Sequence, residues 1–433
     1  MKGNVLIAAV AVAIACGAMG EPFKDGDRVV FLGDSITRAG NYMRYVTDYY
    51  YTRFPDRRIE FFNAGVSGDT SAGCGRRLGE DVNVHKPTVV SIMFGMNDCN
   101  KCLFLEPFDE KCERQLDVVG GRYFTNMVNL ARRLKRDNPG VRLIWAKPSI
   151  FDETAAIPAQ NRPNKNKRVL KRFAEIVDDV AKAEGGEVVD FTTPMTEFNA
   201  LRQKGDPSYT MIGPDRVHPG QAGGFFMAMC YLRDTGCPAI VDTITLEGVG
   251  RPRKVAARAL PLAIEPGCSN VTDHIDAREF SRELVVVKNL PPGRYRLLID
   301  GKAVTNEAAE AFAAGVDVAG NIRNPDLVQA AGVISLNRKR VWIEQKHRMM
   351  CSVREFVRRE CGGVTDDMAK VKALYDSLPQ ERKTRDFFAK QLPDYIEKWP
   401  ARDSVAQELC ELVSQIREAA RPVARTYEIV PLK

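Results

Sequence analysis

Short apolar runs alternate with longer amphipathic segments over the first half of the chain. The runs are rich in Val, Ile and Phe, and they lie at 29–32, 59–62, 89–94, 143–146 and 188–191. Runs of this length and composition predict strands that are buried on both faces. Because amphipathic segments separate them, the pattern predicts a parallel sheet covered by helices on both sides.

The amphipathic segments carry apolar residues three and four positions apart, which is the period of a helix. One segment covers 124–134 and ends at Asn138-Pro139-Gly140, and another covers 169–180 and ends at Gly185-Gly186. Glycine and proline at these points are typical of helix ends. A last helix of this region is expected after Pro219-Gly220.

The pattern changes after Pro238. Three short apolar runs then predict strands, at 244–246, 283–287 and 295–299. A Pro-Pro-Gly turn at 291–293 lies between the last two runs. Strand runs separated by such turns predict a small antiparallel β module, which we place at 240–302.

The remainder of the chain, 303–433, is predicted to be mainly helical. Apolar residues recur every seven positions in one long predicted helix, at Leu336, Ile343, Met350 and Val357. Such a stripe indicates packing against other helices rather than a cofactor site. A terminal apolar run at 426–430 predicts an edge strand. Basic residues of the long helix are expected on a solvated face, among them Arg338, Lys339, Arg340 and Arg358.

The first twenty residues have the pattern of a secretory signal peptide. Lys2 precedes an apolar run at 5–15, and small residues follow before Glu21. This order is typical of exported proteins, and the run is too short to span a bilayer. We therefore expect export to the periplasm or the medium, without a stable membrane span. A lipid anchor at Cys16, holding the protein at the cell surface, is the alternative.

Composition and charge exclude one class of partner. The chain has 433 residues, with 63 Lys and Arg against 56 Asp and Glu, and a formal net charge of +7. That excess is small for this length, and no dense basic block is interleaved with aromatic residues. Nucleic acid is therefore not an expected partner.

Eleven cysteines are present, and ten remain if Cys16 leaves with the signal peptide. An even number in an exported protein permits disulfides. Cys99 and Cys102 have the spacing of half a zinc site, but only Cys112 follows and no histidine lies near. A zinc site needs a second ligand pair, so no metal is expected. The cysteines of this segment are expected to pin a loop by disulfides or to remain partly free.

The candidate chemistry centres on Ser35, which follows the first predicted strand. A serine hydroxyl is a poor nucleophile until a base takes its proton, and histidine is the usual base. Only His218 both follows the predicted parallel sheet closely and has a carboxylate three residues before it, at Asp215. That spacing allows Asp215 to orient one ring nitrogen while the other faces the serine. The other histidines are His85 in a predicted loop, His274 in the β module and His347 on the long helix.

Two further residues have the properties of oxyanion donors. Gly68 lies in a Gly/Ser-rich turn after the second predicted strand, and Asn97 follows the third. A glycine N–H can approach a ligand closely, and an asparagine amide can donate to the same oxygen. Because the carboxyl ends of parallel strands lie at one edge of the sheet, we expect Ser35, Gly68 and Asn97 to meet there.

Four sequence blocks together resemble the SGNH (GDSL-like) hydrolases. In the order of that family they are Gly33-Asp34-Ser35-Ile36-Thr37, Asn63-Ala64-Gly65-Val66-Ser67-Gly68, Gly95-Met96-Asn97-Asp98 and Asp215-Arg216-Val217-His218-Pro219. The resemblance covers about residues 28–235 and implies a flavodoxin-like three-layer α/β/α sandwich. It differs from the Gly-x-Ser-x-Gly hydrolases, because Thr37 stands where their second glycine belongs.

The resemblance also implies a role for each candidate residue. Ser35 would be the nucleophile, His218 the base and Asp215 the orienting acid. The oxyanion hole would consist of the backbone N–H groups of Ser35 and Gly68 and the side chain of Asn97. One departure from the family pattern is a Cys-rich insertion between Cys99 and Gly121, which is expected to form a lip of the site or only a surface loop.

The sequence patterns predict a domain order, and the resemblance implies an activity. A signal peptide at 1–20 would precede a catalytic domain at 21–239, the β module at 240–302 and the helical region at 303–433. The activity would be that of a serine esterase without a metal or cofactor, so EDTA is expected to leave turnover unchanged.

The substrate is expected to be a small-molecule or glycan ester. Exported family members with additional C-terminal modules often resemble carbohydrate esterases, so O-acetyl groups on carbohydrates are the first interpretation. A lipase- or lysophospholipase-like acyl hydrolase is the alternative among enzymes. A non-catalytic glycan-binding protein on an esterase fold is the alternative from another class.

Overall fold

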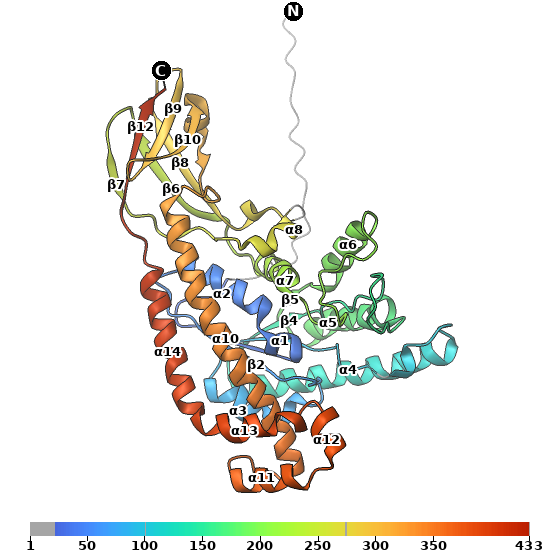
Figure 1. The fold of residues 1–433 in the computed structure, drawn as a ribbon. Helices are drawn as coiled ribbons and strands as arrows, with labels where there is room; N and C mark the ends of the chain where they lie inside the picture. Colours follow the sequence, from blue (N-terminus) through green and yellow to red (C-terminus); the bar gives the residue numbers. More distant parts are fainter. Residues whose placement is uncertain (1–21, 100, 273–274, 433) are drawn as a thin grey trace, which may run out of the picture.

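A five-stranded parallel sheet forms the centre of the first half of the chain (Figure 1). The computed structural model describes residues 22–99, 101–272 and 275–432. All pairings within this sheet are parallel, which confirms the expected three-layer α/β fold. In spatial order its strands are β2 (Glu60–Gly65), β1 (Arg28–Gly33), β3 (Val89–Met93), β4 (Arg142–Ala146) and β5 (Glu187–Val189).

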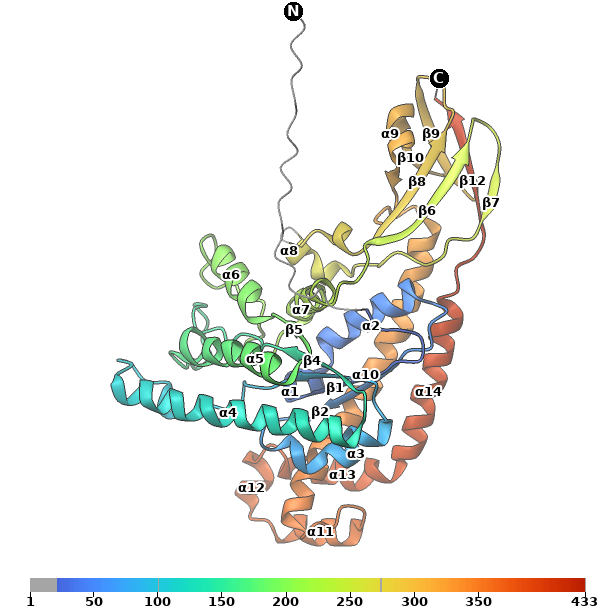
Figure 2. The same ribbon diagram turned by 180° about the vertical axis from the view of Figure 1, so that it is seen from behind.

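Helices cover both faces of the sheet. They are α1 (Ser35–Ala39), α2 (Asn41–Arg53), α3 (Leu78–Asp81), α4 (Glu110–Asp137), α5 (Lys171–Glu184), α6 (Thr192–Gln203) and α7 (Gln221–Asp234). On one face α2 packs against α7, and on the other α4 packs against α5, which Figure 2 shows in front of the sheet. The helices predicted within 124–134, at 169–180 and after Pro219-Gly220 are therefore present, although the second opens with a π-helical turn over Lys165–Leu170.

The helix α4 begins earlier than its pattern predicts and takes up half of the Cys-rich insertion. Asp109 caps it, accepting a hydrogen bond from the N–H of Cys112 at 2.8 Å. Gly120 obscured this extension in the sequence, because glycine disfavours helix interiors. In the fold, a Cβ at Gly120 would lie 3.0 Å from the Cδ1 atom of Ile176, so a glycine allows α4 to approach α5 closely.

The β module is a sandwich of two sheets with one shared apolar core. One sheet has the order β11-β8-β6 and the other β10-β9-β12-β7. The core is closed by Tyr427 and Ile429, which come from the end of the chain. The strands are β6 (Ile240–Glu247), β7 (Arg253–Val255), β8 (Arg282–Lys288), β9 (Arg294–Ile299), β10 (Lys302–Ala308), β11 (Val316–Asp317) and β12 (Arg425–Pro431).

Two predictions about this module are wrong. It is not wholly antiparallel, because β6 pairs with β8 in parallel. The terminal strand β12 is not at an edge, because it lies between β9 and β7. The strands β8 and β9, which flank the Pro-Pro-Gly turn, also belong to different sheets. Alternating apolar residues determine which face of a strand is buried but not which strand lies beside it.

A long helix, α10 (Pro325–Glu360), connects the sandwich to the far end of the molecule (Figure 1). It packs against α2 and against α14 (Arg402–Ala419). Its stripe residues Met350 and Val357 are buried in a cluster with the short helices that follow, as the heptad spacing predicted. The short helices that follow are α11 (Met368–Ser377), α12 (Gln380–Arg385) and α13 (Leu392–Lys398). Two further short helices, α8 (Ser269–Thr272) and α9 (Ala309–Ala314), precede α10 in the chain.

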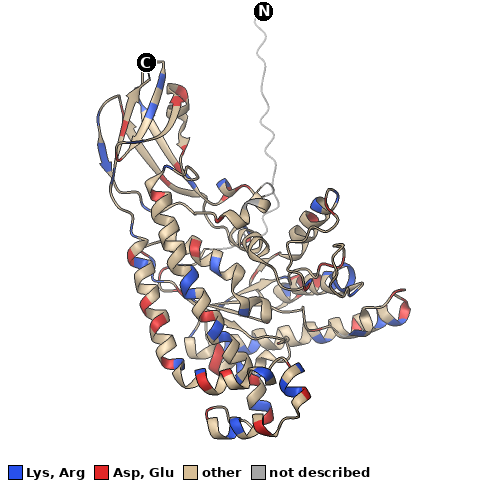
Figure 3. Ribbon diagram, in the orientation of Figure 1, with Lys and Arg blue, Asp and Glu red and all other residues tan. Residues whose placement is uncertain are grey.

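The basic residues of α10 are not all solvated, contrary to expectation. Basic and acidic residues are interspersed along α10 and α14 (Figure 3). Arg338 and Lys339 are exposed, but Arg340 is buried and pairs with Glu344 at 3.3 Å. Arg358 is partly buried and pairs with Glu80 at 2.5 Å. The helical period showed the apolar stripe, but it did not show that Arg340 is buried with Glu344 of the same helix or that Glu80 of α3 faces Arg358.

The centre of this ionic contact is Asp81, at the end of α3. Its carboxylate accepts from Arg77 at 3.1 Å, from Arg348 at 3.1 Å and from Arg354 at 3.0 Å. Burial of Asp81 opposes ionisation, but the three guanidinium groups outweigh it and hold the pKa of Asp81 well below its ordinary value. The pairs join α10 to the edge of the central sheet.

Several sequence predictions concern metals, thiols and membranes. The described cysteines are all free, so a disulfide-pinned loop is wrong and the alternative of free thiols holds. Within the described ranges, no three His, Cys, Asp or Glu side chains converge as metal ligands would. No helix in that part of the chain is long and apolar enough to cross a bilayer. The predicted signal peptide, with Cys16, and His274 lie outside the described residues.

We expect the substitution Asp81→Asn to destabilise the fold strongly. It would remove the one charged carboxylate that three clustered, buried guanidinium groups share, and breaking a buried ion pair typically costs about 3–5 kcal/mol of the free energy of unfolding. Thermal unfolding should show a clearly lower midpoint for this variant. The matched control Asp56→Asn, at an exposed turn position, should unfold like the wild type. Equal midpoints for the two variants would contradict the structural role of Asp81.

Candidate active site

The first strand places Ser35 at the carboxyl edge of the central sheet. Strand β1 ends at Gly33, and α1 begins at Ser35. Asp34 caps this helix, because its Oδ1 atom accepts a hydrogen bond from the N–H of Ile36 at 2.9 Å. A Cβ at Gly33 would lie 2.3 Å from the Oγ1 atom of Thr37, so only glycine fits where the strand turns into the helix.

Ser35 is the first member of a hydrogen-bonded chain of three side chains. Its Oγ atom lies 2.8 Å from Nε2 of His218. The Nδ1 atom of His218 lies 2.5 Å from Oδ2 of Asp215. The structure thus places a hydroxyl and a carboxylate on the two nitrogens of one imidazole. Ser35 and His218, which it brings together, are 183 residues apart in the sequence. This is the geometry in which a histidine can take the proton of a serine hydroxyl.

The Asp215 carboxylate is held in place by its own turn. Its Oδ1 atom accepts hydrogen bonds from the backbone N–H groups of Val217 and His218, each at 3.0 Å. Partial burial opposes ionisation of Asp215, but these bonds and the His218 ring outweigh it and lower the pKa of Asp215. The carboxylate is therefore ionised at neutral pH and can orient the imidazole.

Arg216 anchors the turn that carries both Asp215 and His218. It is buried, with a φ of 66°. Its guanidinium donates hydrogen bonds at 2.8–3.0 Å to the backbone carbonyls of Asp152, Ala155, Ile157 and Ala159. Sequence reasoning assigned Arg216 no role, because a surface arginine and a buried one look alike in a sequence.

The two candidate oxyanion residues lie next to each other. Asn97 donates from Nδ2 to the backbone carbonyl of Asp69 at 3.1 Å, which places its amide against the turn that contains Gly68. The same atom lies 3.5 Å from Oδ2 of Asp34, the residue before Ser35. Gly68 is exposed and has a φ of +74°, a conformation that other residues adopt at a cost. The carboxyl ends of β1, β2 and β3 thus meet at one point, as expected.

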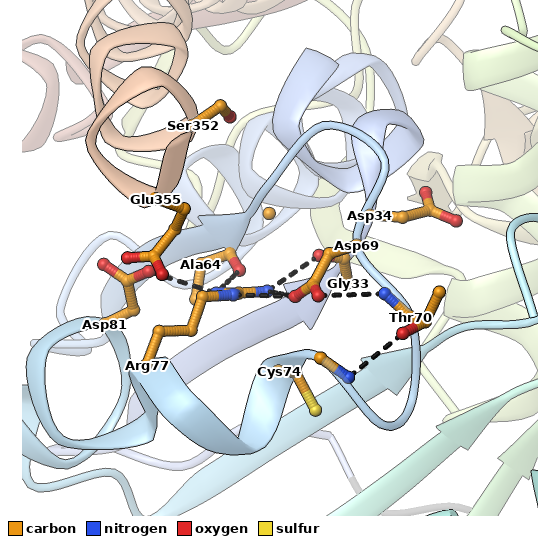
Figure 4. Close-up of polar contacts among 12 residues, drawn as sticks. Gly33, Asp34, Ala64, Asp69, Thr70, Cys74, Arg77, Asp81, Ser352 and Glu355 are labelled. Carbon is orange, nitrogen blue, oxygen red and sulfur yellow. Dashed lines mark hydrogen bonds and ion pairs between the residues drawn. The ribbon is translucent and has the colours of Figure 1, made fainter. Parts of the chain in front are cut away.

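One buried residue that the sequence analysis missed joins these strand ends. Arg77 donates hydrogen bonds to the carbonyl of Gly33 at 3.1 Å and to the carbonyl of Ala64 at 2.7 Å. Its Nε atom also donates to the Oδ2 atom of Asp69 at 2.7 Å (Figure 4). One guanidinium therefore ties together the end of β1, the end of β2 and the turn after β2. No motif marks this arginine, since it acts on backbone carbonyls.

A second carboxylate connects the Asn97 block to the same turn. Asp98 accepts hydrogen bonds from the backbone N–H of Ser71 at 2.9 Å and from the N–H of Gly95 at 3.0 Å. Its Oδ1 atom also accepts from the Ser71 hydroxyl. Burial raises the pKa of Asp98 to about 6, although these hydrogen bonds favour the charged form.

The Cys-rich insertion begins two residues after Asn97. Its residue Phe104 lies beside Lys165, whose Nζ atom is 5.6 Å from the centre of the ring. The backbone carbonyl of Leu105 accepts a hydrogen bond from Asn164 at 2.6 Å. The insertion therefore packs on the segment that leads into α5, with its second half formed by α4.

Comparisons with known proteins agree with this geometry. Residues 31–224 match the model of the GDSL-like Lipase/Acylhydrolase family. An acetylxylan esterase from Geobacillus stearothermophilus is 28% identical over 226 residues, which are 49% of this chain and 94% of that esterase. The solved structure of a gut microbial diltiazem-metabolizing enzyme is 28% identical, with a TM-score of 0.82, over 96% of this chain and 99% of that enzyme. This second similarity extends through the β sandwich and the helical region.

We expect a fluorophosphonate probe to label the wild-type protein at Ser35. The hydrogen bond at 2.8 Å allows His218 to take the proton of that hydroxyl, so we expect Ser35→Ala to abolish labelling. His218→Ala should slow labelling by about 10³-fold or more. Mass spectrometry of the labelled peptide checks the site, and circular dichroism checks that both variants are folded. Labelling of folded Ser35→Ala at an unchanged rate would rule out this serine.

We also expect a pH-dependent effect of Asp34 on stability. Complete burial raises the pKa of Asp34 from 3.8 to about 7, with Asp98 and Asp69 adding to the shift and the N–H of Ile36 opposing it. Between pH 3.8 and about pH 7 the folded protein binds more protons at Asp34 than the unfolded chain does. The contribution of Asp34 to the free energy of unfolding therefore falls as pH rises. Asparagine carries no charge and can accept the same N–H.

The variant Asp34→Asn should therefore gain stability relative to the wild type as pH rises from 5 to 8. Unfolding midpoints at four pH values in this range measure the difference. The same difference for Asp56→Asn, an exposed carboxylate, should stay flat. If the difference in midpoint between Asp34→Asn and the wild type is also independent of pH, Asp34 has its ordinary pKa.

Proposed function

Because residues 31–224 belong to the SGNH (GDSL-like) hydrolase superfamily and the chain is a carboxylic ester hydrolase, we propose that it removes O-acetyl groups from carbohydrates with Ser35 as nucleophile. The observation that carries this proposal is the hydrogen-bonded chain from Ser35 through His218 to Asp215, with separations of 2.8 and 2.5 Å. These distances are those of an assembled nucleophile and base.

In the proposed mechanism, His218 takes the proton of Ser35 as the hydroxyl attacks the ester carbonyl. Asp215 holds the imidazole and stabilises the positive charge that it gains. The N–H groups of Ser35 and Gly68 and the amide of Asn97 donate to the oxyanion of the tetrahedral intermediate. His218 then protonates the leaving alcohol, and an acetyl ester forms on Ser35. Water, deprotonated by His218, hydrolyses that ester and releases acetate.

The substrate class is supported by the relatives. The similar protein from Geobacillus stearothermophilus is an acetylxylan esterase, and its alignment covers the half of this chain that includes the candidate site. The relative that covers nearly the whole chain metabolises the drug diltiazem, which suggests a site that also admits a bulky substrate. The first observation favours a small acyl group, and the second favours room for a large remainder of the substrate.

An acyl-chain series tests the proposal. We expect p-nitrophenyl acetate to be hydrolysed with a kcat/KM at least about tenfold above that of the butyrate and octanoate esters. Both esters have longer acyl chains than acetate, and one methylene group too many in a small acyl pocket costs roughly 1–3 kcal/mol. Acetate release from acetylated xylo-oligosaccharides should be measured on the same preparation, with Ser35→Ala as the blank. Preference for octanoate would favour a lipase-like hydrolase. A folded wild type that the fluorophosphonate probe does not label and that hydrolyses no ester would favour a glycan-binding protein.

A further inference from the structure

A cavity of about 380 Å³ opens beside the turn that contains Gly68. One wall is this turn, from Val66 to Gly73, followed by Arg76 and Arg77. The opposite wall comes from α10 and from Phe388, outside the residues that match the hydrolase family. Figure 4 shows Ser352 and Glu355 on the helix, facing the turn with Asp69 and Thr70. The candidate oxyanion donor Gly68 lines the cavity, so the cavity adjoins the candidate active site, although Ser35 and His218 do not line it.

The two walls are fixed to each other. The N–H of Ser67 donates a hydrogen bond to the Oγ atom of Ser352 at 3.0 Å. Arg348, one turn earlier on α10, donates to the carbonyl of Gly65 at 3.1 Å. The helix is therefore held against the turn by bonds to its backbone. A cavity with walls tied in this way is a preformed site rather than a gap between two moving parts.

One hydroxyl and one carboxylate on these walls are open to a ligand's hydrogen bonds. The Oγ atom of Ser67 is buried and has no hydrogen-bond partner among the described residues. The Oε1 atom of Glu355 accepts no hydrogen bond there either, although it lies in ion-pair range of Arg354 at 3.6 Å and Arg358 at 3.7 Å. Beside them, Phe388 lies next to Phe356, with ring centres 6.0 Å apart. A partly buried ring beside a free hydroxyl and a carboxylate suits a sugar, which offers an apolar C–H face and hydroxyls at its edges.

The charge of the cavity is positive. Four arginines line it against two carboxylates, those of Asp69 and Glu355. Asp69 is already paired with Arg77 at 2.7 Å. Arg76 and Arg359 are exposed and form no ion pair within the described part of the chain. Two guanidinium groups are thus available to an anion at the mouth of the cavity.

We propose that this cavity is a subsite for an acidic sugar, a uronic acid adjacent to the acetylated residue of the glycan. Arg76 and Arg359 bind its carboxylate, while Ser67 and Glu355 bind its hydroxyls and Phe388 packs on its ring. This inference rests on the proposed acetylesterase function and adds the substrate's charge to it. The helical region thereby acts as a specificity wall for the catalytic site.

The experiment compares acetate release from two acetylated xylo-oligosaccharides, one with and one without a glucuronic acid substituent. For the wild type we expect the acidic substrate to have the higher kcat/KM, by about tenfold, and this preference should shrink as salt rises. Arg359→Gln and Arg76→Gln should each lower the ratio of acidic to neutral kcat/KM by about fivefold or more, through KM. The matched control Lys339→Gln, which removes a charge elsewhere on α10, should leave the ratio unchanged.

Two outcomes overturn different claims. Suppose that the wild type hydrolyses p-nitrophenyl acetate and has the same kcat/KM for the acidic and the neutral oligosaccharide. The esterase proposal then stands and the acidic subsite is wrong. If no acetate ester is hydrolysed, the proposed function itself fails. A further variant, Phe388→Ala, should raise KM for both oligosaccharides. An unchanged KM for both would show that no sugar ring packs on Phe388 in this cavity.

Discussion

The buried guanidinium of Arg77 holds together the backbone segments on which the site depends. It donates to the carbonyls of Gly33 and Ala64 and pairs with Asp69. Gly33 is the last residue of β1, Ala64 is the second-last residue of β2, and Asp69 follows Gly68. A buried carbonyl left without a hydrogen bond would be costly. Arg77 donates to the Ala64 carbonyl and adds a second hydrogen bond to the Gly33 carbonyl, which also accepts from the N–H of Val66 at 3.1 Å. Arg77 therefore helps to fix the position of Ser35 relative to the turn that contains Gly68.

The same arginine extends this constraint to the C-terminal half of the chain. Arg77 shares the carboxylate of Asp81 with Arg348 and Arg354, which lie on α10. Arg348 in turn donates to the carbonyl of Gly65. Buried ion pairs tolerate little misplacement, since each charge loses its water and needs its partner in good geometry. The helix is thus fixed beside the oxyanion turn, where it forms one wall of the adjoining cavity.

The parts of the site that the sequence predicted are those set by local rules. Ser35 follows a strand, Asp215 lies three residues before His218, and Asn97 follows the third strand. Each statement concerns a few neighbouring residues, and a parallel sheet then brings the strand ends together. Arg77 and Arg216 escaped notice, because they bind backbone carbonyls that any sequence provides. The parallel pair β6–β8 and the inner position of β12 escaped for a related reason, since strand pairing depends on partners far along the chain.

By itself, the sequence determined the fold class and the side chains able to do the chemistry, because hydrophobic period and motif spacing act over short distances. Only the tertiary structure decided what surrounds that chemistry. The cavity wall joins Ser67 to Ser352, which are 285 residues apart. From the sequence alone, the buried arginines of α10 look like surface residues. The structure shows that Arg348 and Arg354 bind Asp81. Contacts of this kind exist only after burial has brought distant charges and hydroxyls out of water and against one another.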